Sequence, residues 1–347
     1  MGKKGSFDNI FKSKNFWSLT VLALLLLCNL IFTKGFFRIE IKDGHLFGSL
    51  IDILNRAAPM IIISIGMTLV IATKGIDISV GSTLAITGAV VAMLIGGNLQ
   101  IVDGVQTYIS KVPMALAIIV ALLVAALIGL WNGFLITRVG MQPIIATLIL
   151  SVAGRGVAQL LTNGQIITVY YKPFFFIGGG YLFGLPFSIY LVALIVGGTF
   201  FLTRKTALGM FIESVGVNPV AARVSGINSK NLMAAIYAFC GLCAGVAALL
   251  VTSNVKSADG IHAGELFELD AILAVAIGGT SLAGGKFYLM GSVIGALIIQ
   301  TLKTTIYSIG VPPEINLVVE ALVVFIVMLI QSEDFRKIVF RVKTVTE

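Results

Sequence analysis

The sequence predicts an all-α polytopic membrane protein, and three observations support this class. Hydrophobic residues make up 58% of the chain and charged residues only 12%, whereas soluble globular domains carry roughly 25% charged residues. The mean hydropathy is +1.03. Apolar runs of about 20 residues, the length of a membrane-spanning helix, recur along the chain. Two long apolar regions are also broken by glycine-rich segments, at Gly75–Ser82 and Gly279–Lys286.

Ten membrane spans follow from apolar length, and we expect them to form a single transmembrane domain over residues 1–347. The spans are placed at about 16–33, 53–73, 83–97, 113–137, 142–162, 186–203, 231–252, 266–278, 287–306 and 315–331. The eighth is too short for a full crossing, which is typical of a broken or re-entrant segment.

The segment Gly75–Ser82 interrupts what would otherwise be one long hydrophobic run. Gly75 and Gly81 free the backbone from helical geometry, and the side chains of Asp77 and Ser79 can hydrogen-bond the amides that a break leaves without partners. At membrane depth, nonhelical backbone is tolerated only inside protein or against a water-filled cavity. We therefore expect a substrate path near this segment.

A second glycine-rich segment lies 204 residues further along, and Gly285 aligns with Gly81. Its candidate hinge glycines are Gly279, Gly284 and Gly285. Paired broken segments are typical of transporters built from an internal repeat. Two halves, approximately 16–162 and 186–331, would hold five spans each. An odd number per half turns the second copy upside down, so we expect the two breaks to belong to an inverted repeat.

The basic residues can be sorted by side of the membrane if the N-terminus is cytoplasmic. Fifteen of the 24 then fall on inside segments and eight on outside segments, and Arg155 lies within a span. Because positively charged loops face the cytoplasm, this distribution favours a multi-pass protein with both termini cytoplasmic. It also accounts for the net charge of +8 without nucleic acid, since no basic stripe interleaved with aromatic residues is present.

The longest polar connection on the predicted cytoplasmic side spans residues 203–231. Within it, Asn218–Val224 has the pattern of a short helix, with an asparagine cap, proline in the first turn and Gly226 as its stop. A capped helix of this kind can contact a cytoplasmic partner; the alternative is a simple interfacial connector. The candidate contact residues are Glu213, Asn218, Ala221, Ala222 and Arg223.

Several kinds of chemistry are not expected. A nucleotide-binding loop is missing, because Thr280 stands where its first glycine belongs and Phe287 where its hydroxyl belongs. The chain itself is therefore not expected to hydrolyse ATP. Cys240 and Cys243 lie within an apolar run and are interpreted as packing residues rather than a redox pair. The two histidines are isolated in loops, so neither a metal site nor a cofactor is expected.

Few ionisable residues lie inside the predicted spans: Arg155 and Glu320, with Asp77 at a break. Ion-coupled carriers use membrane carboxylates or unwound backbone to hold the ion. This scarcity disfavours proton coupling, although Asp77 keeps an ion-coupled secondary transporter as the alternative. A membrane enzyme would need clustered acids or histidines, and the cluster Glu265, Glu268 and Asp270 is interpreted as a solvated outer edge.

Three stretches make the chain similar to a known family. They are Gly75-Ile-Asp-Ile-Ser-Val-Gly-Ser82, Leu269-Asp-Ala-Ile272 running into Ile277-Gly-Gly-Thr-Ser-Leu-Ala-Gly-Gly285, and Ala221-Ala-Arg223. Together they resemble the permease subunits of bacterial ribose-type sugar ABC importers, over about residues 16–331. Further stretches at 43–49, 52–59, 153–159 and 203–213 resemble the galactofuranose branch of that family. Ile78, where leucine is usual, is a small departure.

The resemblance implies a core of two permease subunits, a homodimer or heterodimer, in the cell inner membrane. It further implies cytoplasmic ABC ATPase subunits and a periplasmic sugar-binding protein as partners. The expected cargo is a monosaccharide, galactofuranose or a related furanose or pentose. An ion-coupled secondary sugar transporter remains the alternative function.

Candidate pathway residues lie on two of the spans and at the first break. Arg155 and Gln159 are one helical turn apart and share a face of the fifth span, and Asn55 lies near the start of the second. The full set is Asn55, Arg56, Asp77, Ser79, Arg155 and Gln159. These side chains can offer weak hydrogen bonds to sugar hydroxyls; the alternative for Arg155 is a purely structural pairing.

Overall fold

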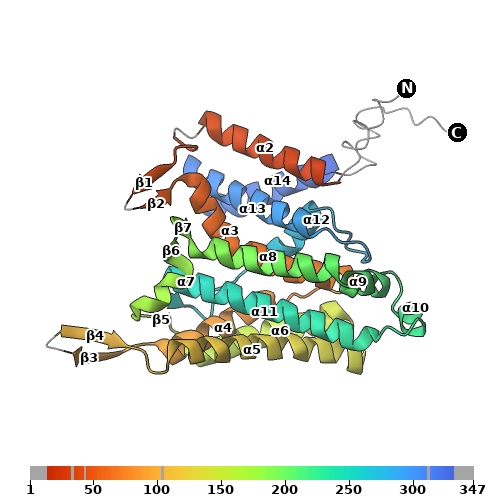
Figure 1. The fold of residues 1–347 in the computed structure, drawn as a ribbon, viewed down its shortest axis with the longest axis horizontal. Coiled ribbons are helices and arrows are strands. Elements are labelled where there is room, and N and C mark those ends of the chain that lie inside the picture. Colours follow the sequence, from red (N-terminus) through yellow and green to blue (C-terminus); the bar gives the residue numbers. More distant parts are fainter. Residues whose placement is uncertain (1–13, 33–34, 43, 103–104, 311–312, 332–347) are drawn as a thin grey trace.

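A computed structural model describes residues 14–32, 35–42, 44–102, 105–310 and 313–331 (Figure 1). The terminal segments 1–13 and 332–347, which the charge distribution assigns to the cytoplasm, lie outside these residues.

Within the described residues, a helix lies at each of the ten places where a span is predicted. These helices are α2 (Lys14–Phe32), α3 (Ser49–Ala72), α4 (Val80–Ile95), α5 (Met114–Phe134), α6 (Pro143–Thr162), α8 (Phe187–Lys205), α11 (Ser229–Val255), α12 (Phe267–Ile277), α13 (Leu289–Ile309) and α14 (Pro313–Gln331). By length and apolar composition, six of them can cross a membrane: α3, α5 with its C-terminal extension, α6, α8, α11 and α13.

The other helical elements are short. They are a π-helical turn η1 (Leu135–Val139) that extends α5, a 3-10 turn η2 (Lys172–Phe175), α7 (Phe176–Gly179), α9 (Leu208–Val217) and α10 (Pro219–Val224). Helix α9 is an addition to the prediction, because the sequence reading of residues 203–231 assigned a helix only to 218–224.

In the described part of the chain, eight short strands form four two-stranded antiparallel sheets at one end of the helices, on the left of Figure 1. The pairs are β1 (Glu40–Lys42) with β2 (His45–Phe47), β3 (Asn98–Val102) with β4 (Val105–Ile109), β5 (Ile167–Thr168) with β8 (Ser257–Ala258), and β6 (Tyr181–Leu182) with β7 (Leu185–Pro186). We call this the strand end. The opposite end, which carries α9 and α10, is the α10 end.

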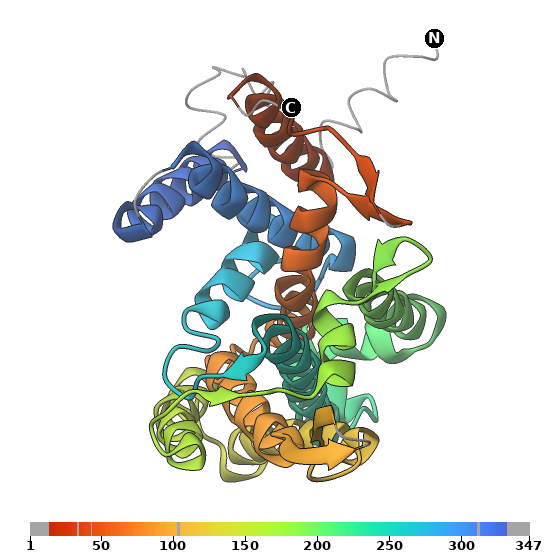
Figure 2. The same cartoon turned by 90° about the vertical axis from the view of Figure 1, so that its left-hand side faces the viewer.

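Helix α3 is the central element of the core. From Ala57 to Ala72 every residue is buried except the half-buried Pro59, as expected for a helix that is apolar on all sides. Viewed from the strand end, α3 lies between α13 and α8 (Figure 2). On its α11 side, a Cβ added to Gly66 would lie 3.0 Å from the Cα of Cys240. Cys240 and Cys243 are both buried free thiols at this contact, which confirms their interpretation as packing residues.

Helices α5 and α11 approach closely along a row of small residues. Ala121, Ala125 and Gly129 are buried at four-residue spacing on α5, and a Cβ at Gly129 would lie only 2.2 Å from the carbonyl oxygen of Tyr237. Small residues allow such close backbone contact between membrane helices. Other large apolar residues of α5, such as Ile119, Leu123 and Leu127, are 54–61% exposed. This outer face is suited to lipid.

The two glycine breaks lie at the same end of the molecule, and the prediction that they form an inverted pair is wrong. The amide of Gly285 donates to the carbonyl of Ala72 at 2.9 Å, so the breaks touch at the α10 end. The physical reason is the count of crossings between them. They follow the second and the eighth predicted spans, six apart, and an even number restores the original direction.

The short helix α12 agrees with the prediction of a broken or re-entrant segment at this place. Its 11 residues rise about 16 Å, roughly half of a bilayer core. The chain that leads into it from β8 has no regular structure, and it runs inward past α6 and α4. There the Arg155 guanidinium donates to the carbonyl of Ala263, and a Cβ at Gly81 would lie 2.3 Å from the carbonyl oxygen of Gly264. These contacts hold Ala263 and Gly264 of the nonhelical segment against α6 and α4, whereas its residues Ile261, His262, Glu265 and Leu266 are exposed.

Candidate functional site

Helix α10 forms as its sequence predicts. The Asn218 side chain accepts hydrogen bonds from the amides of Val220 and Ala221 at 3.0 and 3.1 Å. Pro219 occupies the first turn, where its missing amide hydrogen costs nothing. The helix ends before Gly226, whose φ of +88° lies in the left-handed region that favours glycine. This confirms the predicted cap and stop.

Four of the five candidate contact residues line one groove beside α9 and α10. The groove has a volume of about 450 Å³, and Glu213, Asn218, Ala221 and Ala222 lie on its walls. Lys286, from the second glycine break, closes one side of it. Arg223, the fifth candidate, lines a neighbouring pocket. The groove therefore joins the capped helix to the second break.

The outer surface of α9 and α10 is apolar although it belongs to a connection between helices. Met210, Val217, Val220 and Val224 are 62–86% exposed. Exposed apolar side chains grouped on a small element, with a charged residue such as Arg223 among them, are typical of a protein-binding surface. An interfacial connector would bury the same side chains at the membrane surface, so the contact with a partner stays a prediction.

The end of α9 packs against both glycine breaks at once. A Cβ added to Gly216 would lie 1.9 Å from the carbonyl oxygen of Ala72 and 2.6 Å from the amide nitrogen of Gly285. The Lys74 ammonium donates to the carbonyl of Val217 at 2.9 Å. Backbone thus meets backbone here, without side chains between the three segments. A displacement of α9 must move both breaks, because close-packed backbone segments transmit a shift directly to their neighbours.

Of the five candidate hinge glycines, three adopt positive φ: Gly279, Gly284 and Gly285, at +83° to +92°. The other two are required by close approach, Gly75 to the Tyr237 hydroxyl and Gly81 to the loop before α12. Side chains larger than hydrogen are strained or blocked at these positions.

Asp77 and Ser79 are brought together in a buried network within the first break. One carboxylate oxygen of Asp77 accepts from the amide and the hydroxyl of Ser79 at 3.0 and 2.6 Å. The Asn132 amide group of α5 donates to the Ser79 hydroxyl at 2.8 Å and to Asp77 at 3.4 Å. Asp77 and Ser79 are each only 1% exposed. In this structure they hold the turn between α3 and α4 and do not face an open path.

If the chain carries sugar as its family resemblance implies, we predict that Asp77→Asn retains uptake and that Asp77→Ala destabilises the protein. An asparagine oxygen can still accept the Ser79 hydrogen bonds, whereas alanine leaves buried donors unsatisfied, at about 1–3 kcal/mol. Thermal unfolding of the purified protein and uptake in vesicles measure the two effects. Loss of uptake by a stable Asp77→Asn variant would instead favour ion coupling through this carboxylate.

The remaining pathway candidates are attached to different elements. Asn55 accepts a hydrogen bond from the Ser188 hydroxyl of α8, and Arg56 forms an exposed ion pair with Asp52 at 2.8 Å. Arg155 donates a hydrogen bond to the carbonyl of Ala263, and Gln159 is half-buried one turn further along α6. The structural pairing weighed for Arg155 is therefore present. The structure does not gather these four side chains around one cavity.

Two elements of this region escaped sequence reasoning. Helix α9 was read as polar connection, although its buried residues Gly209, Ile212 and Gly216 follow helical spacing. Asn132 was overlooked because it lies inside an apolar run, and a buried polar residue there is the signal that could have drawn attention to it. In the described part of the chain, no group of His, Cys, Asp and Glu residues could hold a metal ion.

Comparison with known proteins places these features in a family. Residues 49–328 match the family model described as branched-chain amino acid transport system / permease component. The chain is 46% identical to the galactofuranose transporter permease protein of Escherichia coli K12, over 94% of this chain and 92% of that protein. The fructose import permease of Bifidobacterium longum is 37% identical, over 91% and 87%.

The ribose import permease of Escherichia coli K12 is also similar, at 34% identity over 90% of this chain and 93% of the relative. No solved structure matches the chain.

Proposed function

The chain belongs to the family of branched-chain amino acid transport system permease components, as a ribose-type sugar permease of an ABC importer, and on this premise we propose that it carries galactofuranose or a related furanose or pentose. The observation that carries the choice of sugar is the 46% identity to a galactofuranose transporter permease, which extends over nearly the whole of both chains. As a multi-pass permease it lies in the inner membrane, and ATP hydrolysis takes place on a separate subunit.

We further propose that α9 and α10 receive the cytoplasmic ATPase subunit. The exposed valines and Arg223 offer a surface for it, and the packing of Gly216 against Ala72 and Gly285 supplies a rigid route to both breaks. In this account the α10 end and both termini are cytoplasmic, and the strand end faces the periplasmic sugar-binding protein. A second permease subunit completes the core, as a homodimer or heterodimer.

We retain the division into two inverted halves, 16–162 and 186–331, as a proposal with a different pairing. Five spans per half pair the second span with the seventh, which are α3 and α11. These two long helices run in opposite directions and pack through Gly66 and Cys240. The two glycine breaks are then neighbours in one cytoplasmic layer rather than repeat partners.

The substrate proposal is tested by reconstituting the permease with its ATPase subunit and binding protein in liposomes. Labelled galactofuranose, ribose, fructose and galactopyranose would be offered with ATP inside the vesicles. We expect ATP-dependent uptake of galactofuranose above the others, and no hydrolysis by the permease alone, since it lacks a nucleotide-binding loop. Uptake that needs an ion gradient and no ATPase subunit would support the ion-coupled alternative.

We predict that Arg223→Ala is mild and that Arg223→Glu is severe. Arg223 is exposed, so the loss of its charge costs about 1 kcal/mol or less. A glutamate facing an acidic site on the partner would cost several kcal/mol through like-charge repulsion. Co-purification of the ATPase subunit and sugar uptake measure the two effects. Equal, near wild-type values for both variants would remove α10 as the contact.

A further inference from the structure

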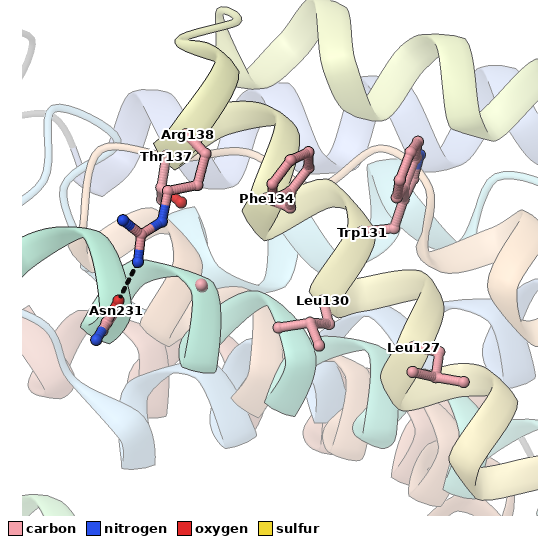
Figure 3. Close-up of a pocket in the computed structure, with 8 residues that line it drawn as sticks. Leu127, Leu130, Trp131, Phe134, Thr137, Arg138 and Asn231 are labelled. Atoms are coloured by element: carbon pink, nitrogen blue, oxygen red, sulfur yellow. Dashed lines mark hydrogen bonds between the residues drawn. The ribbon is translucent and has the colours of Figure 1, made fainter.

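A groove opens on the outer face of α5 near the α10 end, beside the start of α11 (Figure 3). It has a volume of about 480 Å³. Leu127, Leu130, Trp131 and Phe134 line it and are 45–61% exposed. Arg138 stands at one end of this apolar row, and its guanidinium donates to the Asn231 side chain at 2.7 Å.

A basic pocket lies beside the groove, and Arg138 lines both cavities. This pocket of about 280 Å³ is lined by Arg138, Arg223 and Lys230 and by the turn that starts α11, and no carboxylate lines either cavity. A guanidinium carries five N–H donors, of which Asn231 takes one. The N-terminus of the 27-residue α11 adds a partial positive charge. The pocket is therefore suited to an anion.

The depth of Arg138 in the membrane agrees with a headgroup position. Helix α5 and its π-turn span 26 residues, Met114–Val139, or about 39 Å against a hydrocarbon core of about 30 Å. If the helix is centred in the core, Arg138 lies roughly 17 Å from the midplane, just beyond the acyl region. Leu127 and Phe134 then lie at acyl-chain depth, and Trp131 lies between them.

We propose that this groove and pocket bind an anionic phospholipid. The phosphate lies against Arg138 and Lys230, and one acyl chain runs along Leu127, Leu130, Trp131 and Phe134. A second copy of the chain fits less well, because a two-fold contact would bring the same cations face to face. The π-turn supports a binding role, since such turns are frequent at functional sites and here η1 carries Arg138.

The test uses Trp131 as the reporter. The sequence has two tryptophans, so Trp17→Phe leaves Trp131 alone in the full-length protein. This variant is placed in phosphatidylcholine nanodiscs that contain increasing amounts of either brominated phosphatidylglycerol or brominated phosphatidylcholine. We expect brominated phosphatidylglycerol to quench Trp131 fluorescence at a mole fraction at least about fivefold lower than brominated phosphatidylcholine does. Each nearby cation contributes about that factor to the binding of an anionic lipid. High salt should reduce this preference.

Two variants locate the headgroup. Arg138→Gln with Lys230→Gln should abolish the preference for the anionic lipid, whereas Arg204→Gln, an exposed cation at the end of α8 that lines neither cavity, should keep it. Arg223 is left unchanged, so that an effect on the ATPase contact cannot produce the result. If both brominated lipids quench the Trp17→Phe protein equally, the proposal is overturned, and the charge variants are not needed for that conclusion. Absence of quenching by both lipids also overturns it, and would mean that protein covers the groove.

Discussion

Replacing Gly216 with alanine should nearly abolish sugar uptake while leaving the protein in the membrane. The new Cβ would lie 1.9 Å from the carbonyl oxygen of Ala72 and 2.6 Å from the amide nitrogen of Gly285. These are backbone atoms, so no side chain can move aside. Relief requires α9 to shift away from the two breaks, at a cost of about 1–3 kcal/mol. A shift of that size changes a two-state equilibrium by roughly 5- to 150-fold.

The matched control for this prediction is Gly197→Ala on α8, where an added Cβ meets nothing within 4 Å. Uptake and ATP hydrolysis stimulated by the binding protein would be measured for both variants in liposomes. We expect the control to behave as wild type and Gly216→Ala to hydrolyse ATP without transport. Normal transport by a correctly assembled Gly216→Ala protein would show that the contact of α9 with the breaks is not needed.

The second large effect is expected at Gly81. A Cβ there would lie 2.3 Å from the carbonyl oxygen of Gly264 and 2.4 Å from a carboxylate oxygen of Glu268. Alanine must therefore push the broken segment before α12 away from α4, and leucine must displace it further. We expect uptake to fall strongly with Gly81→Ala and to vanish with Gly81→Leu.

Gly156→Ala on α6 is the control for Gly81, because its Cβ would point into open space. Membrane levels and elution as a single species would be checked for each variant. A folded Gly81→Leu protein that transports at the wild-type rate would mean that the approach of α4 to the broken segment has no part in transport.

Much of this architecture was accessible from the sequence, because local patterns decide it. Apolar length placed the helices, and the Asn218, Pro219 and Gly226 pattern gave α10 its bounds. The glycines of both breaks were found from their positions between long apolar runs. Such features depend on neighbours within a few residues, which the sequence displays directly.

The rest depends on which helices face each other, and the sequence does not display that. Spacing put Arg155 and Gln159 on one face of α6, but nothing in it showed that this face meets the segment before α12. The contact of Ala72 with Gly285 joins residues more than 200 positions apart. The relative orientation of the two breaks was mispredicted because it was derived from the odd number of spans in each half. The number of spans from one break to the other decides it, and that number is even.

We place α10 on the cytoplasmic side of the membrane, in contact with the ATPase subunit. The most direct test is Val224→Cys, at a position that is 86% exposed, in a Cys28→Ser background; Cys240 and Cys243 are buried. A membrane-impermeant maleimide should label inside-out vesicles but not right-side-out vesicles, and assembly with the ATPase subunit should block the labelling. Labelling of right-side-out vesicles, or equal labelling with and without the ATPase subunit, would contradict the account.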